Sequence, residues 1–107
     1  MKYMMLVCGD EATPAPPGIG EDTEDWVTEM DGRGVRVTGD ALRPISDATT
    51  IRVRNGEVLL SDGPFAETKE QIFGFDILDA ADLDEAIEIA SKHPVARYGT
   101  LEIRPFR

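Results

Sequence analysis

The chain has few of the residues that mark disulfide-bonded, metal-binding or cofactor-binding proteins. Its 107 residues include one cysteine, one histidine and one tryptophan. One cysteine cannot form an intramolecular disulfide, which favours a cytoplasmic location, and we interpret Cys8 as a small apolar residue at a strand end. No spacing of histidines, cysteines and acids is typical of a metal site. No phosphate-binding glycine loop is present, and we expect no cofactor.

Basic residues are also scarce. The 11 lysines and arginines are outnumbered by 21 aspartates and glutamates, so the net charge is -10. Nucleic acid is bound by basic surfaces, and this balance argues against it as a partner. No apolar run is long enough for a membrane span or a signal peptide, so we expect no membrane association. The length suits one domain over residues 1–107.

Short apolar and alternating runs predict the strands. Residues 3–8 are apolar at consecutive positions, which is typical of a strand buried on both faces. Asn55-Gly56 lies between runs 49–54 and 57–60 and predicts a β-hairpin, because both central residues of such a turn need positive φ. Further strands are predicted around residues 35–38, over 73–78 and over 101–104.

Two segments have helical patterns. A brief helix is predicted from about Asp22 to Asp31, with apolar residues on one side and acids on the other. A clearer helix is predicted over residues 82–92, where Asp82 and Glu85 have the spacing of a capping box and Pro94 ends the helix. The apolar face predicted for this second helix consists of Leu83, Ala86, Ile87 and Ala90.

The order strand, helix, strand, hairpin, strand, helix, strand predicts an α+β fold. In this fold an antiparallel sheet has two helices on one face and an added β-hairpin. Because the first strand is apolar on both sides, the second face of the sheet must also be covered, and no segment of the chain is left to cover it. We therefore expect a homodimer in which the two sheets face each other.

A motif in the second half of the chain resembles a known family. Asp62–Gln71 reads DGPFAETKEQ, and the residues after it include Gly74-Phe75, His93-Pro94 and Glu102–Pro105. Together they resemble the YCII-related family, and more narrowly the branch named for its Asp-Gly-Pro-Phe (DGPF) motif. The resemblance covers nearly the whole chain. It implies a ferredoxin-like subunit that assembles as a dimeric α/β barrel.

The resemblance also implies a catalytic pair, from which this chain departs. In shorter YCII-like proteins the pair is a histidine on the first helix and a nearby aspartate. The predicted helix 22–31 contains no histidine, while Asp40 lies at a position like that of the aspartate. Asp40 is therefore a candidate catalytic residue without its partner. We interpret His93, before Pro94, as a structural cation at a helix C-terminus.

The DGPF motif itself allows a structural and a functional interpretation. In the structural one, Gly63-Pro64 make a sharp turn, Phe65 fills the core below it, and Asp62 accepts backbone hydrogen bonds from Ala66 or Glu67. The motif is then a folding and dimerisation device. In the functional one, Asp62 is a second candidate catalytic residue. The candidate ligand-binding residues are Gly63, Pro64, Phe65, Glu67, Lys69 and Arg104.

The functional interpretation places Asp62, Glu67 and Lys69 at the rim of a pocket between the sheet and the helices. Glu67, Lys69 and Glu70 project from a single helical turn, and Arg104 reaches them from the neighbouring strand. A lysine and an arginine beside carboxylates can bind an acidic small molecule or tune a carboxylate as a general base.

Two functions stay open. The first is a small enzyme that acts on a small organic acid or lactone in a pocket near the DGPF motif. The second is a non-catalytic ligand-binding or accessory module linked to sigma-factor regulation, which the resemblance implies through members of this branch found near or fused to such factors. The missing helix histidine favours the second.

Overall fold

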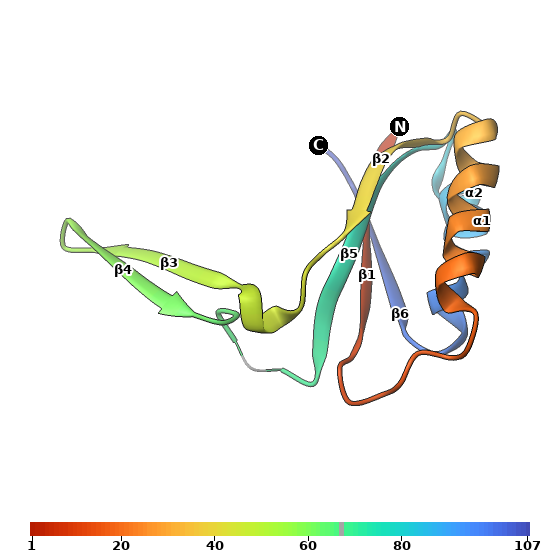
Figure 1. Ribbon diagram of the computed structural model, residues 1–107. Helices are drawn as coiled ribbons and strands as arrows, with labels where there is room; N and C mark the ends of the chain where they lie inside the picture. The colour runs from red at the N-terminus through yellow and green to blue at the C-terminus, as the bar shows by residue number, and fades with distance from the viewer. Residues whose placement is uncertain (67) are drawn as a thin grey trace.

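The computed structural model describes residues 1–66 and 68–107 and has two parts, a body and a projecting hairpin (Figure 1). The body is a four-stranded antiparallel sheet with both helices on one face. Its strands follow the spatial order β2-β5-β1-β6, which is ferredoxin-like. This confirms the predicted α+β class with an antiparallel sheet. The elements of the body are β1 (Lys2–Asp10), α1 (Ile19–Gly32), β2 (Arg36–Ala41), β5 (Glu70–Asp79), α2 (Leu83–Ser91) and β6 (Thr100–Pro105).

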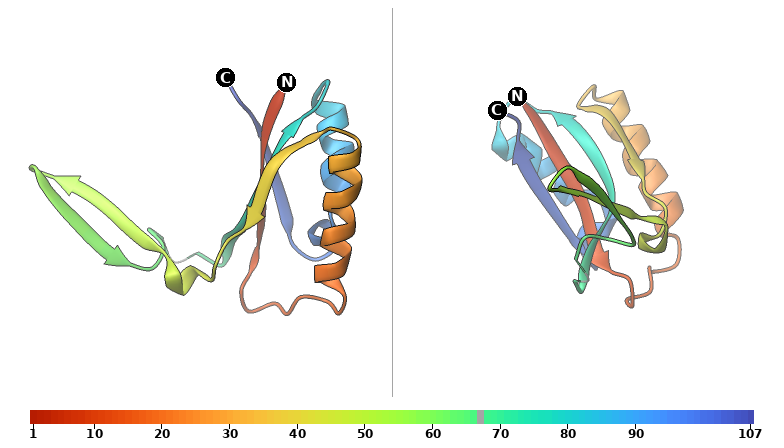
Figure 2. Two further views of the ribbon diagram at one scale, coloured as in Figure 1. Left: turned by 45° about the horizontal axis from the view of Figure 1, so that its top comes forward. Right: turned by 90° about the vertical axis from the view of Figure 1, so that its left-hand side faces the viewer.

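The projecting hairpin, which we call the arm, consists of β3 (Thr49–Arg54) and β4 (Glu57–Asp62). The predicted turn is confirmed, with φ of 52° at Asn55 and 79° at Gly56. The arm leaves one end of the sheet on the side opposite the helices (Figure 1 and the left view of Figure 2). A short 3-10 turn, η1 (Ile45–Asp47), lies at its root.

The core lies between the sheet and the helices. Tyr3, Met5 and Val7 of β1 are buried on this side, against Trp26 and Met30 of α1. The alternate residues of β1 point to the other face of the sheet, which we call the open face and which carries Met4, Leu6 and Cys8 of β1 with Phe75 and Ile77 of β5. No described part of the chain covers the open face, so the subunit alone does not bury β1 on both faces.

The helices differ from expectation in detail. Helix α1 begins at Ile19, three residues before the predicted start. Helix α2 is capped as predicted at Asp82, whose Oδ1 accepts from the amide of Glu85 at 2.9 Å, while the Glu85 carboxylate accepts from the amide of Ala81 at 3.0 Å.

The predicted apolar face of α2 is partly wrong. Leu83 and Ile87 are 52% and 51% exposed, whereas Ile89 is fully buried. The indole N–H of Trp26 donates to the carbonyl of Ile89 at 3.0 Å. The side of α2 that carries Ala86, Ile89 and Ala90 faces the core. None of the described helices is long and apolar enough to cross a membrane.

Candidate functional site

A cavity of about 320 Å³ lies between α1 and the sheet. This volume is at the small end of the range for ligand sites, which combine apolar walls with a few polar groups. The walls include Val7, Val27, Phe73 and Val95. The polar residues that line the cavity come from α1, β2, β5 and the segment after α2, and they are Thr23, Arg36, Asp40, Asp76, His93 and Tyr98.

Asp76 is the buried acid of this cavity. It pairs with Met5 in the sheet register and therefore points to the helix side, where it is 6% exposed. The Nε of Arg36 donates to its Oδ1 at 2.7 Å. Burial raises the pKa of Asp76, and the hydrogen bond and charge of Arg36 offset this only in part. A carboxyl group with a raised pKa in a cavity is suited to proton transfer.

Arg36 is held on three sides. Its Nη1 donates to Asp31 at 3.2 Å and its Nη2 to the carbonyl of Gly39 at 2.9 Å, while its Nε binds Asp76. Asp76 can approach Arg36 this closely because Gly39, the residue beside it on β2, has no side chain. A Cβ there would collide with the Asp76 carboxylate and lie 2.5 Å from the carbonyl oxygen of Phe75. The guanidinium and carboxylate therefore form a rigid pair at the cavity wall.

His93 is a neutral histidine in the wall of the cavity. It is 4% exposed, and this burial lowers its pKa to about 4, so the predicted cation is wrong. Its Nδ1 accepts from the amide of Val95 at 3.1 Å, which places the proton on Nε2. The ring also meets Trp26 edge-on, with centroids 4.7 Å apart.

The Nε2 atom of His93 is free to meet a ligand. No hydrogen-bond partner for it is found in the described part of the chain. Since no buried side-chain nitrogen or oxygen there lacks a partner, Nε2 is accessible from the cavity that the ring lines. His93 can therefore donate an N–H to a bound molecule.

The predicted catalytic residue Asp40 also lines this cavity. Its side chain is exposed, and its Oδ1 accepts from the amide of Ala41 at 2.8 Å. The structure therefore brings Asp40 together with Asp76 and His93, neither of which was a predicted site residue. Asp40 pairs with Phe75 in the register, so its side chain points to the open face, although the residue borders the cavity.

The DGPF residues lie elsewhere, at the root of the arm. Asp62 ends β4 and is exposed. Gly63 turns the chain with φ of 93°, and its amide donates to the carbonyl of Ala48 at 2.7 Å. Phe65 is 80% exposed, so the prediction that it fills the core is wrong. The reason is that the arm leads the chain away from the sheet, and no core of the subunit lies below the motif.

The remaining predicted ligand residues do not form one pocket within the subunit. The predicted helical turn is not found among the described residues of this segment, and Glu67 lies outside the described residues. Lys69 is exposed and 3.9 Å from Asp10. Arg104 pairs with Met4 in the register, at the opposite end of β1 from Asp10, and it binds Glu102 at 2.7 Å.

The buried residues of the cavity had a weak signal in the sequence. Asp76 stands between Phe75 and Ile77 in an otherwise apolar strand, and Arg36 stands between two valines. A charged residue inside such a run indicates a buried partner. Which residue provides that partner depends on how β2 pairs with β5, and that pairing has no local signal.

Two other chemistries find no support in the described residues. No group of three or more His, Cys, Asp or Glu residues in that part of the chain can hold a metal ion. Burial and the nearby Glu102 and Glu70 raise the pKa of the Cys8 thiol, which disfavours the thiolate.

Fold and cavity define the class of this protein as a ferredoxin-like α+β subunit with a small cavity between α1 and the sheet. Its sequence matches the YCII-related domain over residues 1–107, and the protein belongs to that family. It is 47% identical over 122 residues to an uncharacterised protein of Rhizobium meliloti (strain 1021), across 98% of this chain and 91% of that protein.

A solved structure shares the fold. It is 5-chloro-2-hydroxyhydroquinone dehydrochlorinase (TftG) from Burkholderia phenoliruptrix AC1100, in complex with 2,5-dihydroxybenzoquinone. The TM-score is 0.53 at 11% sequence identity, covering 100% of this chain and 94% of that chain. At this identity the similarity concerns the fold alone.

Proposed function

We propose that this YCII-related protein is a small enzyme that acts on a small organic acid or lactone. We place the substrate in the cavity between α1 and the sheet rather than next to the DGPF motif. The observation that carries the proposal is Asp76, a buried carboxyl group whose pKa burial raises beside a fixed arginine. Such a group can exchange a proton with a bound molecule.

The other polar residues of the cavity fit this role. The Nε2–H of His93 donates a hydrogen bond to a substrate oxygen and stabilises negative charge that develops there when Asp76 removes a proton. Because His93 is neutral, it acts as a donor and not as a counter-charge. Asp40, which borders the cavity, stays the second candidate acid or base, although its side chain points to the open face.

The choice of probe follows from the shared fold. The dehydrochlorinase structure is a complex with 2,5-dihydroxybenzoquinone. This compound is a flat ring with two hydroxyl and two carbonyl groups, so it offers an acidic proton and oxygen acceptors in a small volume. It is the first compound to test, followed by a panel of small organic acids and lactones.

The test separates binding from turnover. Each compound is titrated by calorimetry, and its consumption is then followed by absorbance or chromatography. We expect Asp76→Asn to bind the substrate but to lose at least about 100-fold in turnover, the usual range for a general acid or base. Wild-type turnover by Asp76→Asn would refute the mechanism. Failure of every compound to bind would refute the function.

The matched control is Asp62→Asn in the DGPF motif. Asp62 is exposed and outside the cavity, so we expect this variant to bind and turn over substrate like the wild type. A selective loss of activity in Asp62→Asn would instead support the site near the DGPF motif that the sequence predicts.

A second function is favoured by one observation. The Asp76 carboxylate already binds Arg36, which is itself held by Asp31 and Gly39. An acid fixed in this way is also suited to retaining a ligand without exchanging protons. We therefore propose, as the alternative, a non-catalytic accessory module linked to sigma-factor regulation. It predicts binding without consumption of the compound by the wild type.

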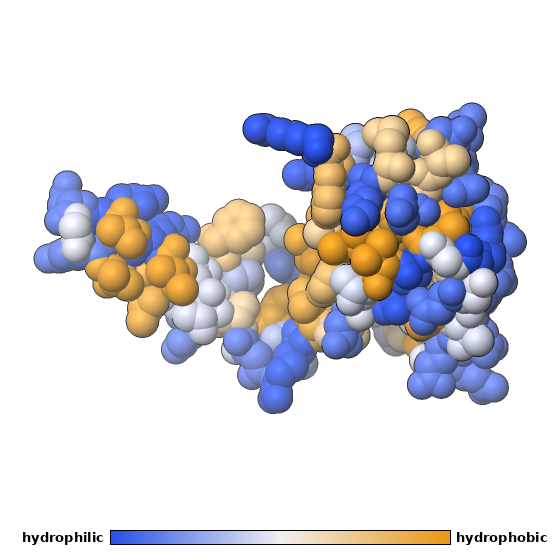
Figure 3. Space-filling model, turned by 90° about the horizontal axis from the view of Figure 1, so that it is seen from above, coloured by the Kyte–Doolittle hydropathy of each residue, from blue (hydrophilic) through white to orange (hydrophobic). Residues whose placement is uncertain are grey.

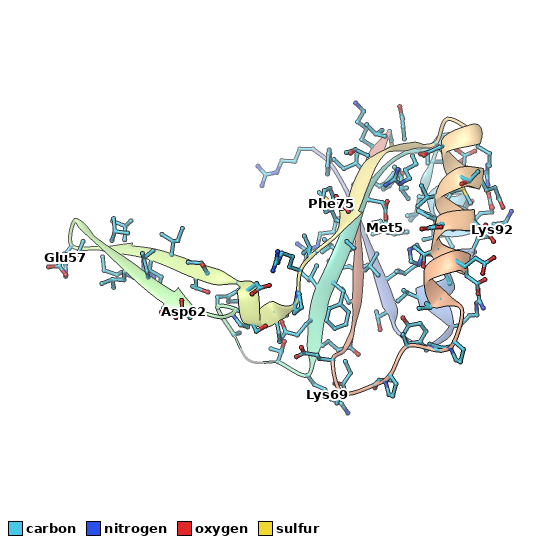
Figure 4. All side chains as sticks on the ribbon, in the orientation of Figure 1. Met5, Glu57, Asp62, Lys69, Phe75 and Lys92 are labelled. Atoms are coloured by element: carbon cyan, nitrogen blue, oxygen red, sulfur yellow. The ribbon has the colours of Figure 1, made fainter. Side chains whose placement is uncertain are left out.

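We further infer that the protein is a cytoplasmic homodimer, a dimeric α/β barrel with the two open faces in contact. Support comes from the uncovered apolar residues of the open face, on which Phe75 points away from the helices while Met5 points towards them (Figure 4). An uncovered apolar sheet face favours association. A monomeric mass at micromolar concentration in sedimentation equilibrium would refute the dimer.

A further inference from the structure

The arm has one aliphatic and one polar face. Its register pairs Ile51 with Leu60 and Val53 with Val58, which places these four side chains on one face. They are 57–67% exposed. The residues that point to the other face are Thr50, Arg52, Arg54, Glu57, Leu59 and Ser61. Figure 3 shows the aliphatic residues of the arm as an exposed patch separate from the body.

The arm is not supported by the rest of the subunit. β3 and β4 pair with each other and, among the described residues, with no other strand, so both outer edges of the arm are open. Every arm residue in these two strands except Thr50 is exposed. A two-stranded hairpin alone is marginally stable in water and needs a third strand or a packing partner. The aliphatic face therefore requires a cover from outside the subunit.

A matching surface lies at the root of the arm. An apolar recess of about 440 Å³ separates the arm from the sheet, and it is lined by Leu42, Ile45, Pro64, Phe65 and Ile72 among others. The aliphatic arm and the apolar recess are thus both uncovered parts of one chain. The arm also stands on the side of the sheet that carries the open face (Figure 1).

We propose that the aliphatic face of the arm packs into the recess of a second copy of this chain, and that the second copy returns the contact. The proposal rests on the homodimer inferred above and adds the element that holds it together. A two-fold axis makes such an interface self-complementary, because each copy provides one arm and one recess.

Charge disfavours an anionic membrane or a nucleic acid as the occupant and permits a second copy. The chain has a net charge of -10, which repels anionic membranes and nucleic acid. Two copies also repel each other, except where charge is balanced. The arm is balanced, since its two arginines, Arg52 and Arg54, are matched by Glu57 and Asp62. The arm is therefore a part of the chain that can approach an identical copy at little electrostatic cost.

This arrangement explains the geometry of the DGPF motif. Gly63 is bound to the start of β3 at two points, since its amide donates to the carbonyl of Ala48 and its carbonyl accepts from the Thr50 hydroxyl at 2.8 Å. These bonds close the base of the arm. Phe65, which fills no core in the subunit, lines the recess that receives the other arm.

Two neighbouring leucines provide a matched test. Leu60 lies on the aliphatic face of β4 and Leu59 on the polar face, and both are exposed. We expect Leu60→Lys to raise the dimer dissociation constant about 100-fold or more in sedimentation equilibrium, as loss of a central interface residue does. Leu59→Lys should stay within about threefold of the wild type. Equal effects of the two variants, or none, would overturn the proposal.

A cross-link tests the recess directly. In a Cys8→Ser background, one preparation carries Val53→Cys on the arm and another carries Ile45→Cys in the recess. Mixing and mild oxidation should give a covalent dimer that needs both preparations. A wild-type dimer without this cross-link would overturn arm docking and leave the contact between open faces standing. A wild-type monomer would overturn both, while binding of 2,5-dihydroxybenzoquinone by that monomer would leave the cavity function intact.

Discussion

The buried neutral His93 makes the free energy of unfolding depend strongly on pH, in a direction that follows from its pKa. In the unfolded chain a histidine has a pKa near 6.5, whereas burial lowers the pKa of His93 to about 4. Between these two values the unfolded chain binds more protons than the folded one. Stability therefore increases with pH over this range and is lost on acidification from about pH 6.5 to pH 4.

The size of the effect follows from the same two values. At about 1.36 kcal/mol per pH unit, the difference between 6.5 and about 4 corresponds to about 3 kcal/mol of unfolding free energy. Since the side chain is 4% exposed, solvent screening does not reduce this value greatly. A loss of about 3 kcal/mol is a large fraction of the stability of a domain of this size.

The variant that isolates this contribution is His93→Asn. An asparagine oxygen can accept the amide hydrogen bond of Val95 that Nδ1 accepts now, and asparagine is a good residue at such a cap. It cannot bind a proton. The variant also loses ring packing on Trp26, so its stability is lower at every pH. The informative quantity is therefore the change with pH, not the absolute stability.

The assay is urea unfolding followed by fluorescence of Trp26, the single tryptophan. Wild type and His93→Asn are compared from pH 7.5 to pH 4 at one protein concentration, because association would shift apparent stability. The wild type should lose about 3 kcal/mol more than the variant over this range. Equal losses in the two proteins would show that His93 is not a buried neutral group.

Other predictions concern the residues that shape the site. Gly39→Ala should lower the unfolding free energy by about 3 kcal/mol, because its Cβ would displace Asp76 from Arg36. Gly32→Ala is the control: its Cβ meets no atom within 4 Å, and thermal unfolding should show no loss. Asp82→Ala should cost about 1 kcal/mol in urea unfolding, since it removes the cap bond to Glu85. An unchanged urea midpoint would contradict the cap.

The parts of the fold that were predicted correctly have short-range causes. The hairpin follows from two residues that adopt positive φ, and the start of α2 follows from a side chain that binds a backbone amide three residues on. Hydrophobic periodicity was less reliable. It identified α2 but assigned Leu83 and Ile87 to the buried side, because the rotation of a helix depends on its neighbours.

The candidate site was predicted only in part. Asp40 borders the cavity, but the residues that give the cavity its chemistry come from separate elements. Arg36 and Asp76 are 40 residues apart and meet because β2 pairs with β5. His93 was interpreted as a structural cation at a helix C-terminus, since the sequence does not show that it packs against Trp26. Burial, which changes the pKa of both Asp76 and His93, is a property of the packed structure.

The sequence by itself determined the order of elements, the arm turn, the cap of α2 and the family, because each depends on neighbouring residues or on a contiguous motif. Only the tertiary structure decided that Asp76 and His93 share a cavity and that Phe65 lies outside the core. It also showed that the four aliphatic residues of the arm, which pair with each other, stay exposed in the described part of the subunit. The physical reason is that burial and pairing depend on how distant segments pack, and no local pattern specifies that packing.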